Sequence, residues 1–355
     1  MKRKQLFVRN FSAGLYLESF LVAAVASVLI IRLFLQLTGY PQIGGGGLHI
    51  AHMLWGGLLM LASIIVLLSF LGKWAAQLAA ILGGTGFGAF IDEVGKFVTS
   101  NNDYFFQPAV AMIYVIFILI FIAIRALQRG ATYSREEYLA NALREIEEAA
   151  LHDLDAEERK RALFYLEKTT PDDALALPLR SALAEADLIP HSQAQLLDRI
   201  KNLIKSFYHY VARLWWFPFF VIGFFIVQLV LKLIYVFILI FFVGLGWNEI
   251  LDVQVVGRIA ARMKNLHFVD WAEIVSSLLS GAFVLWGVMQ MRRSRLSSYR
   301  AFKRSVLVSI FFTQVFAFYQ EQFSALLGLL LNIAILVALQ FMIDREESAV
   351  AAAKK

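Results

Sequence analysis

The sequence has 355 residues, of which 59% are hydrophobic, 14% aromatic and 17% charged, with no Cys and a formal net charge of +6. Soluble domains carry about 25% charged residues, and a soluble chain must cover itself with polar surface. The composition therefore excludes a soluble enzyme, a disulfide-bonded secreted scaffold and a disordered chain. The cations flank apolar blocks, a pattern typical of membrane topology and not of nucleic-acid binding.

The hydrophobic residues occur in blocks of about 18 or more, the length that crosses a bilayer. The first block covers about residues 14–37 and follows a basic segment that includes Arg9. It is longer than the apolar core of a signal peptide, so we predict a first span with its N-terminus in the cytoplasm. The next three predicted spans cover about residues 50–71, 76–96 and 108–127.

A polar segment at 128–212 separates these spans from the rest and contains helix-start signals. Ser134-Arg135-Glu136-Glu137 and Asp155-Ala156-Glu157-Glu158 have the spacing of capping boxes. Pro171 and Pro190 are each expected at the first position of a further helix. Residues 131–200 hold 15 acidic and 8 basic side chains. We predict a small cytoplasmic helical domain that could recruit a protein partner, act as a regulatory lid, or only link the two parts.

The C-terminal part has further apolar blocks, and we predict four more spans at about 217–243, 272–291, 305–322 and 324–343. Dividing the fifth span at Lys232 would give nine spans. It would also move the basic loop 292–304 to the outer side, against the preference of Lys- and Arg-rich loops for the cytoplasm. The prediction is an all-α polytopic transmembrane helix bundle of about eight spans in a plasma or inner membrane, with both termini cytoplasmic.

The two groups of four spans are similar in sequence. Residues 89–93 (AFIDE) align with residues 317–321 (AFYQE), and His49-Ile50-Ala51-His52 aligns with His267-Phe268-Val269-Asp270. Two similar halves with an even number of spans would form a parallel repeat. The alternative is chance similarity between apolar segments. The predicted domains are 1–127 and 213–355, the two transmembrane halves, and 128–212, the cytoplasmic helical domain.

Ionisable residues inside spans are costly and therefore mark candidate sites. Several gather at the predicted outer ends of the spans, where Glu93 and Lys96 can pair at i,i+3. The candidates for binding an ion or solute are His49, His52, Asp92, Glu93, Lys96, His267, Asp270 and Glu321. We expect Glu93 and Glu321 to be equivalent and to face the bundle interior. Imidazoles with carboxylates could also bind a divalent metal such as zinc, with His49, His52 and Glu93 as ligands. Each group also has a structural interpretation: helix caps, interfacial histidines, an ion pair, or a wet turn.

Two glycine-rich stretches have a structural interpretation. Gly84 and Gly88 have the small-xxx-small spacing of close helix packing, and Gly44–Gly47 allow an outer loop to fold over the bundle. The stretches GGGGLHIAHMLWGG (44–57) and FIDEVGKF (90–97), with NNDYFF (101–106), resemble a family of uncharacterised bacterial multi-pass membrane proteins. That resemblance covers mostly the first four spans and implies no activity or site residue.

The favoured function is transport or binding of a small solute or ion at a polar site near the outer face. One alternative is a membrane-embedded, metal-assisted enzyme that acts on a lipid. Another is a membrane scaffold that recruits a cytoplasmic protein through 128–212. The pattern assigns no catalytic residue, and a homo-oligomer within the lipid bilayer is compatible with it.

Overall fold

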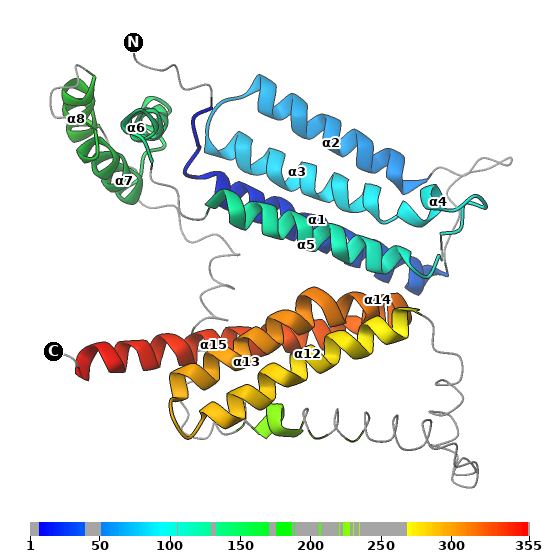
Figure 1. The fold of residues 1–355 in the computed structure, drawn as a ribbon. Helices are drawn as coiled ribbons and strands as arrows, with labels where there is room; N and C mark the ends of the chain where they lie inside the picture. Colours follow the sequence, from blue (N-terminus) through cyan, green and yellow to red (C-terminus); the bar gives the residue numbers. More distant parts are fainter. Residues whose placement is uncertain are drawn as a thin grey trace, which may run out of the picture. The chain divides into compact units, whose positions relative to one another are not determined.

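The structure is a computed structural model that describes residues 7–39, 51–104, 106–128, 133–169, 175–186 and 268–353, with isolated residues between 188 and 234. Every regular element in these ranges is a helix (Figure 1), which confirms the predicted all-α class. The chain divides into two compact units. Unit 1 comprises Met1–Phe106 and Ile116–Arg199, and unit 2 comprises Gln107–Val115 and Ile200–Lys355.

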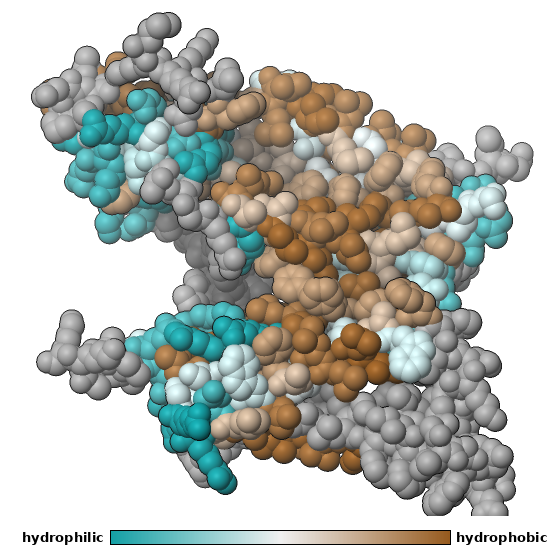
Figure 2. Space-filling view, viewed as in Figure 1, coloured by the Kyte–Doolittle hydropathy of each residue, from teal (hydrophilic) through white to brown (hydrophobic). Residues whose placement is uncertain are grey.

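Six stretches among the described residues are long and apolar enough to cross a membrane, which supports a membrane protein. They are Ala13–Thr38, His52–Ser69, Lys73–Ile91, Ala109–Gln128, Phe268–Gln290 and Arg295–Ser348. Most of the predicted fifth span, at 217–243, lies outside the described residues. In Figure 2, hydrophobic side chains cover the visible faces of the helices α2, α3 and α5, as expected for surfaces that face lipid.

Unit 1 is built around α3 (Lys73–Ile91), which packs against α1 (Ala13–Thr38) and α2 (His52–Ser69). A short turn joins α2 to α3 and includes Gly72, whose φ of +89° suits a glycine. The short helix α4 (Val94–Val98) follows α3. The helix α5 (Ala109–Gln128) then begins in unit 2 and continues in unit 1.

Glycines make the contacts of α3 unusually close on two sides. A Cβ atom on Gly84 would overlap the carbonyl oxygen of Phe20 on α1, and Gly88 lies against Ala24 of α1 in the same way. The predicted small-xxx-small contact is therefore confirmed. On the α2 side, Gly86 faces Gly56, an approach that the sequence pattern did not predict.

The predicted cytoplasmic helical domain is described as α6 (Arg135–Ala150), α7 (Ala156–Glu167) and α8 (Ala176–Glu185). Both predicted capping boxes are present: Glu137 N–H donates to Ser134 Oγ at 3.1 Å, and Glu158 N–H donates to Asp155 Oδ1 at 2.8 Å. The starts predicted at Pro171 and Pro190 lie outside the described residues. These three helices share an apolar core made by Ala142, Leu154, Ala162, Leu166, Ala176 and Leu183.

Unit 2 contains α12 (Phe268–Gln290), α13 (Arg295–Val308), the π-helical segment η3 (Ser309–Thr313) and α14 (Gln314–Glu321). The 3-10 segment η4 (Gln322–Ala325) and α15 (Leu326–Ala353) follow. The chain reverses at Gln322, which has a φ of +51°. Arg300 Nη2 therefore reaches Glu347 Oε1 at 2.8 Å, across the two antiparallel segments. The chain thus reverses where the sequence predicts a turn, between 305–322 and 324–343, although α13 begins ten residues before the predicted boundary of 305.

Candidate functional site

Five charged residues and one tyrosine of unit 1 meet where α3 ends. We call this set the Asp92–Glu93 cluster; its members are Arg32, His52, Asp92, Glu93, Lys96 and Tyr104. The two carboxylates occupy the turn between α3 and α4, Arg32 comes from α1, and His52 is the first residue of α2. Because α3 packs closely on both α1 and α2, its C-terminal end brings side chains from all three helices together.

Asp92 is fully buried, and its carboxylate is paired with Arg32 and hydrogen-bonded by Tyr104. Arg32 Nε donates to Asp92 Oδ1 at 2.5 Å, and Arg32 Nη2 donates to the Asp92 carbonyl oxygen at 2.9 Å. The Tyr104 hydroxyl donates to Asp92 Oδ2 at 2.8 Å, and its ring lies 4.1 Å below the Arg32 guanidinium carbon. Burying a carboxylate costs several kcal/mol unless it is paired in this way, so Arg32 is the partner that allows Asp92 to lie here.

His52 joins the two carboxylates. Its Nε2 lies 3.1 Å from Asp92 Oδ2, and its Nδ1 lies 3.0 Å from Glu93 Oε1. A neutral imidazole has only one N–H group to donate. A neutral His52 can therefore donate to only one of the two ionised carboxylates. Both contacts can be hydrogen bonds only when the three groups together hold one more proton.

Glu93 is the member of the cluster that has a carboxylate oxygen without a hydrogen-bond partner. Its side chain is 1% exposed, and its Oε1 lies 3.0 Å from His52 Nδ1 and accepts from Lys96 Nζ at 3.1 Å. Its Oε2 is buried and has no hydrogen-bond partner. Leaving a buried polar atom without a partner costs about 1–3 kcal/mol, and such an atom in a native fold needs an explanation.

The structure thus brings together four of the eight predicted candidates: His52, Asp92, Glu93 and Lys96. His49 and His267 lie outside the described residues. In unit 2, Asp270 Oδ1 accepts from Gln320 Nε2 at 2.9 Å. Glu321 is exposed at the end of α14, unlike the buried Glu93 that it was expected to match.

The sequence predicts that Arg32, inside the first span, could snorkel or pair in the interior, and it indicates no role for Tyr104. The signal for Arg32 was its place inside a long apolar span, where an unpaired cation is costly. Tyr104 carried no such signal, because a tyrosine beside a span is common at membrane interfaces.

The structure gives no support to the predicted metal set. Within the described ranges, no group of three or more His, Asp or Glu side chains could hold a metal ion. Both ring nitrogens of His52 already face carboxylate oxygens, so neither offers a free lone pair for a metal. His49, the third predicted ligand, lies outside the described residues.

Unit 2 contains a buried polar seam between its helices. Ser280 and Ser305 hydroxyls lie 2.9 Å apart, Gln314 Nε2 donates to the Ala325 carbonyl at 2.7 Å, and Tyr114 donates to the Ile310 carbonyl at 2.8 Å. Ile310 lies in the π-helical segment, and π-helical turns occur frequently at functional sites. The polar atoms of these contacts are paired, however, so the seam is accounted for by helix packing.

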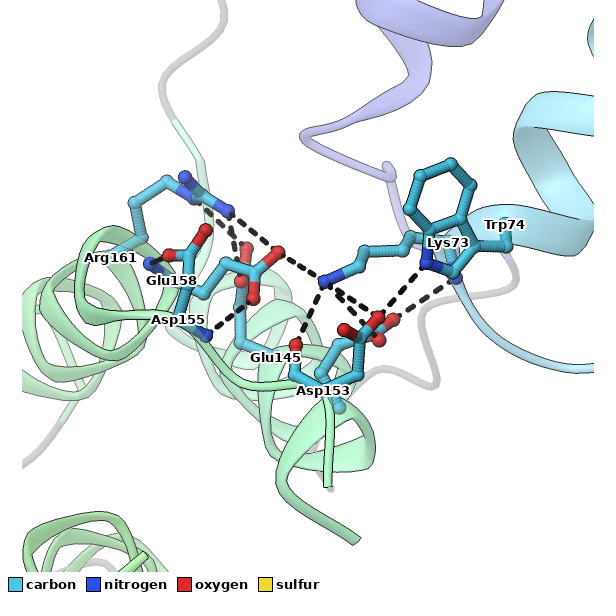
Figure 3. Close-up of polar contacts among 8 residues, drawn as sticks. Lys73, Trp74, Glu145, Asp153, Asp155, Glu158 and Arg161 are labelled. Carbon is cyan, nitrogen blue, oxygen red and sulfur yellow. Dashed lines mark hydrogen bonds and ion pairs between the residues drawn. The ribbon is translucent and has the colours of Figure 1, made fainter. Parts of the chain in front are cut away.

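A second charged cluster of unit 1 lies at the other end of α3 (Figure 3). Lys73 Nζ lies 2.8 Å from Glu158 Oε1, 2.9 Å from the Asp153 carbonyl oxygen and 3.1 Å from Asp153 Oδ2. Arg161 pairs with Glu145 at 3.2 Å within the helical domain. Burial raises the pKa of Glu145 and of Glu148, because the apolar surroundings oppose their charged forms.

The N-terminal segment is bonded to the same helical domain. Arg9 Nε donates to Glu137 Oε1 at 2.7 Å, and Arg9 Nη2 donates to Glu137 Oε2 at 2.9 Å. This two-point contact with Arg9 lowers the pKa of Glu137 to about 2. The Phe11 N–H also donates to Asn141 Oδ1 at 2.9 Å.

Comparison with protein-family models, with curated proteins and with solved structures finds no match for this chain.

Proposed function

We propose that this chain is an integral membrane protein that binds a small solute or ion at the Asp92–Glu93 cluster and moves it across the membrane. The observation that carries the proposal is the buried Glu93 Oε2, a carboxylate oxygen without a hydrogen-bond partner. An ionised carboxylate oxygen only accepts hydrogen bonds and attracts positive charge. The ligand must therefore bring a positive charge or a donor group to this oxygen.

The charge balance of the cluster narrows the class of ligand. Arg32 and Lys96 balance the charges of Asp92 and Glu93, and the additional proton that lets His52 donate to both carboxylates gives the cluster one net positive charge. A monovalent cation at Glu93 Oε2 can take the place of that proton without changing the net charge of the cluster, whereas a divalent cation would leave excess charge in a low-dielectric site. We infer that a monovalent cation or the cationic end of a small solute is the ligand class that fits.

The proposed orientation places the cluster near the outer face and both termini in the cytoplasm of a plasma or inner-membrane protein. Two features support it. The basic loop 292–304 has the composition of a cytoplasmic loop. The polar helical domain α6–α8 lies beside Lys73, the end of α3 opposite to the cluster.

We also propose that the chain contains two related halves. The support is a matching contact in each unit: His52 pairs with Asp92 at 3.1 Å, and at the aligned positions Gln320 donates to Asp270 at 2.9 Å. Gln320→Asp alone should destabilise the protein because two carboxylates would face each other, and adding Asp270→His should restore stability by recreating the first pair. Thermal unfolding of the single and double variants measures this, and a double variant no more stable than Gln320→Asp would contradict the relation.

Cation binding can be tested by thermal unfolding of the purified full-length protein in detergent. The midpoint is measured in NaCl, KCl and NH4Cl against N-methylglucamine chloride, a large cation that keeps the ionic strength constant. A ligand at 100 times its Kd stabilises the folded state by about 2.7 kcal/mol. At least one small cation should therefore raise the midpoint of the wild-type protein, and Glu93→Gln should lose that shift.

Glu147 provides a matched control, because its Oε1 is also buried without a partner but lies in the helical domain. Glu147→Gln should keep the cation-dependent shift. A shift that persists in Glu93→Gln, or that disappears only in Glu147→Gln, would refute the assignment to the Asp92–Glu93 cluster.

A further inference from the structure

The helix α3 carries a charged network at each end. Lys73 is its first residue, and Asp92 and Glu93 follow its last residue, Ile91. A cation in the first turn of a helix is opposed by the helix dipole. Lys73 is therefore poorly placed for its own helix, and its contacts with the helical domain explain its position.

These contacts connect the first turn of α3 to three parts of the helical domain (Figure 3). Lys73 Nζ pairs with Glu158 of α7 at 2.8 Å and with Asp153 of the α6–α7 loop at 3.1 Å. The backbone N–H of Lys73 donates to Glu148 of α6 at 3.0 Å, and the Trp74 indole donates to Asp153 Oδ2 at 3.0 Å. Because α6 and α7 share one apolar core, they hold this end of α3 as a single body.

Between its two ends, α3 can transmit a small displacement. A helix of 19 residues is about 28 Å long and moves as a stiff rod. Its contacts with α1 and α2 at Gly84, Gly86 and Gly88 are made mainly by backbone atoms and Cβ atoms. Packed helices commonly shift by about 1–2 Å in switching proteins. A shift of that size would change the short contacts of Asp92 with Arg32 and His52.

We propose that the cytoplasmic helical domain regulates the Asp92–Glu93 cluster by fixing the position of α3, with Lys73 as the positioning residue. The regulatory role rests on the function proposed for the cluster. The mechanical coupling between the helical domain and the cluster is inferred only from the contacts of α3 described above. Under the competing view, the domain only stabilises the nearby end of α3. In that case, loss of the Lys73 charge lowers stability and leaves the far end of α3 unchanged.

The experiment uses the absence of native Cys. Gln36→Cys on α1 and Ser100→Cys after α4, both exposed positions outside the cluster, receive nitroxide labels in the full-length protein. Pulsed electron–electron double resonance then measures the distance between the two nitroxide labels in lipid nanodiscs. Lys73→Met should broaden this distance distribution or move its mean by about 1–2 Å. Lys73→Arg keeps the charge and should restore the original distribution.

Two further variants keep the test decisive. Glu158→Gln removes the closest charge from the domain side, preserves an acceptor for its capping box, and should reproduce the effect of Lys73→Met. Arg161→Met removes the ion pair with Glu145 at 3.2 Å and a longer one with Glu158 at 3.9 Å but no contact made by Lys73, and should leave the distribution unchanged. An unchanged distribution in both Lys73→Met and Glu158→Gln would overturn the proposal.

The outcome is independent of the cation test. If Glu93→Gln keeps the cation-dependent shift while Lys73→Met moves the labels, the proposed function fails and the coupling stands. If the labels do not move but the cation shift depends on Glu93, the cluster binds cations without control by the helical domain.

Discussion

Gly86→Ala tests the packing that holds the candidate site together. A Cβ atom on Gly86 would lie 2.6 Å from the Gly56 carbonyl oxygen and 2.8 Å from the Met60 backbone nitrogen. Real Cβ atoms essentially never approach another atom closer than 3.0 Å. The helices α2 and α3 must therefore move apart by at least about 0.4 Å.

The size of the effect follows from two opposing terms. Overpacking costs about 1–3 kcal/mol, and a radial gap of about 0.5–1 Å loses roughly a quarter to a half of the dispersion energy of the separated atoms. Replacing a helical glycine with alanine returns about 0.8–1 kcal/mol. We expect Gly86→Ala to be less stable than the wild-type protein by about 1–2 kcal/mol.

Gly57→Ala is the matched control, because a Cβ atom on Gly57 of α2 would meet nothing within 4 Å. It keeps only the gain in helix propensity and should be equal to the wild-type protein or more stable. Thermal unfolding in one detergent should place the midpoint of Gly86→Ala several degrees below that of Gly57→Ala. Equal midpoints would refute the inference that α2 and α3 pack through their glycines.

Three other outcomes are expected. Because Arg9 lowers the pKa of Glu137 to about 2, the stability from this pair is complete above the ordinary Glu pKa of 4.5 and is lost as the pH falls towards 2. Glu137→Gln should therefore flatten acid unfolding measured by circular dichroism over that window, and an unchanged acid limb would contradict the pairing. With the proposed orientation, a Cys at position 100 should react with an impermeant maleimide on intact cells and one at position 160 should not; the reverse pattern would invert the topology. Glu321→Gln changes an exposed side chain and should keep the cation-dependent shift, whereas its loss would favour the equivalence with Glu93 expected from the sequence.

Features with a local cause could be predicted from the sequence. The capping boxes at Ser134 and Asp155 depend on residues three positions apart, and both are formed. The Gly84–Gly88 spacing also places two small residues on one helix face, so its close contact with α1 could be anticipated. A capping box is formed within a single helix turn, and a face of small residues can pack against any neighbouring helix. Neither prediction needs to know which distant segments meet in the fold.

Features that depend on which helices meet could not be predicted in the same way. The pairing of Arg32 with Asp92 joins residues 60 positions apart, and it needs the register between α1 and α3. The role of Tyr104 depends on where its loop returns to the end of α3. The exposure of Glu321 depends on the reversal at Gln322, which directs the end of α14 differently from the turn after α3.

The energetics of the Asp92–Glu93 cluster argue against a purely structural role. A buried ion network is rarely more stable than apolar side chains of similar volume, because desolvation offsets the attraction between the charges. The helices that meet here are already held by close glycine contacts on both sides of α3, so packing does not require the charges. A structural network would also be expected to satisfy all of its atoms, whereas Glu93 Oε2 has no hydrogen-bond partner. A carboxylate oxygen that is costly to bury, unnecessary for packing and without a hydrogen-bond partner supports the proposal that Glu93 binds a ligand and does not only form an ion pair at a helix end.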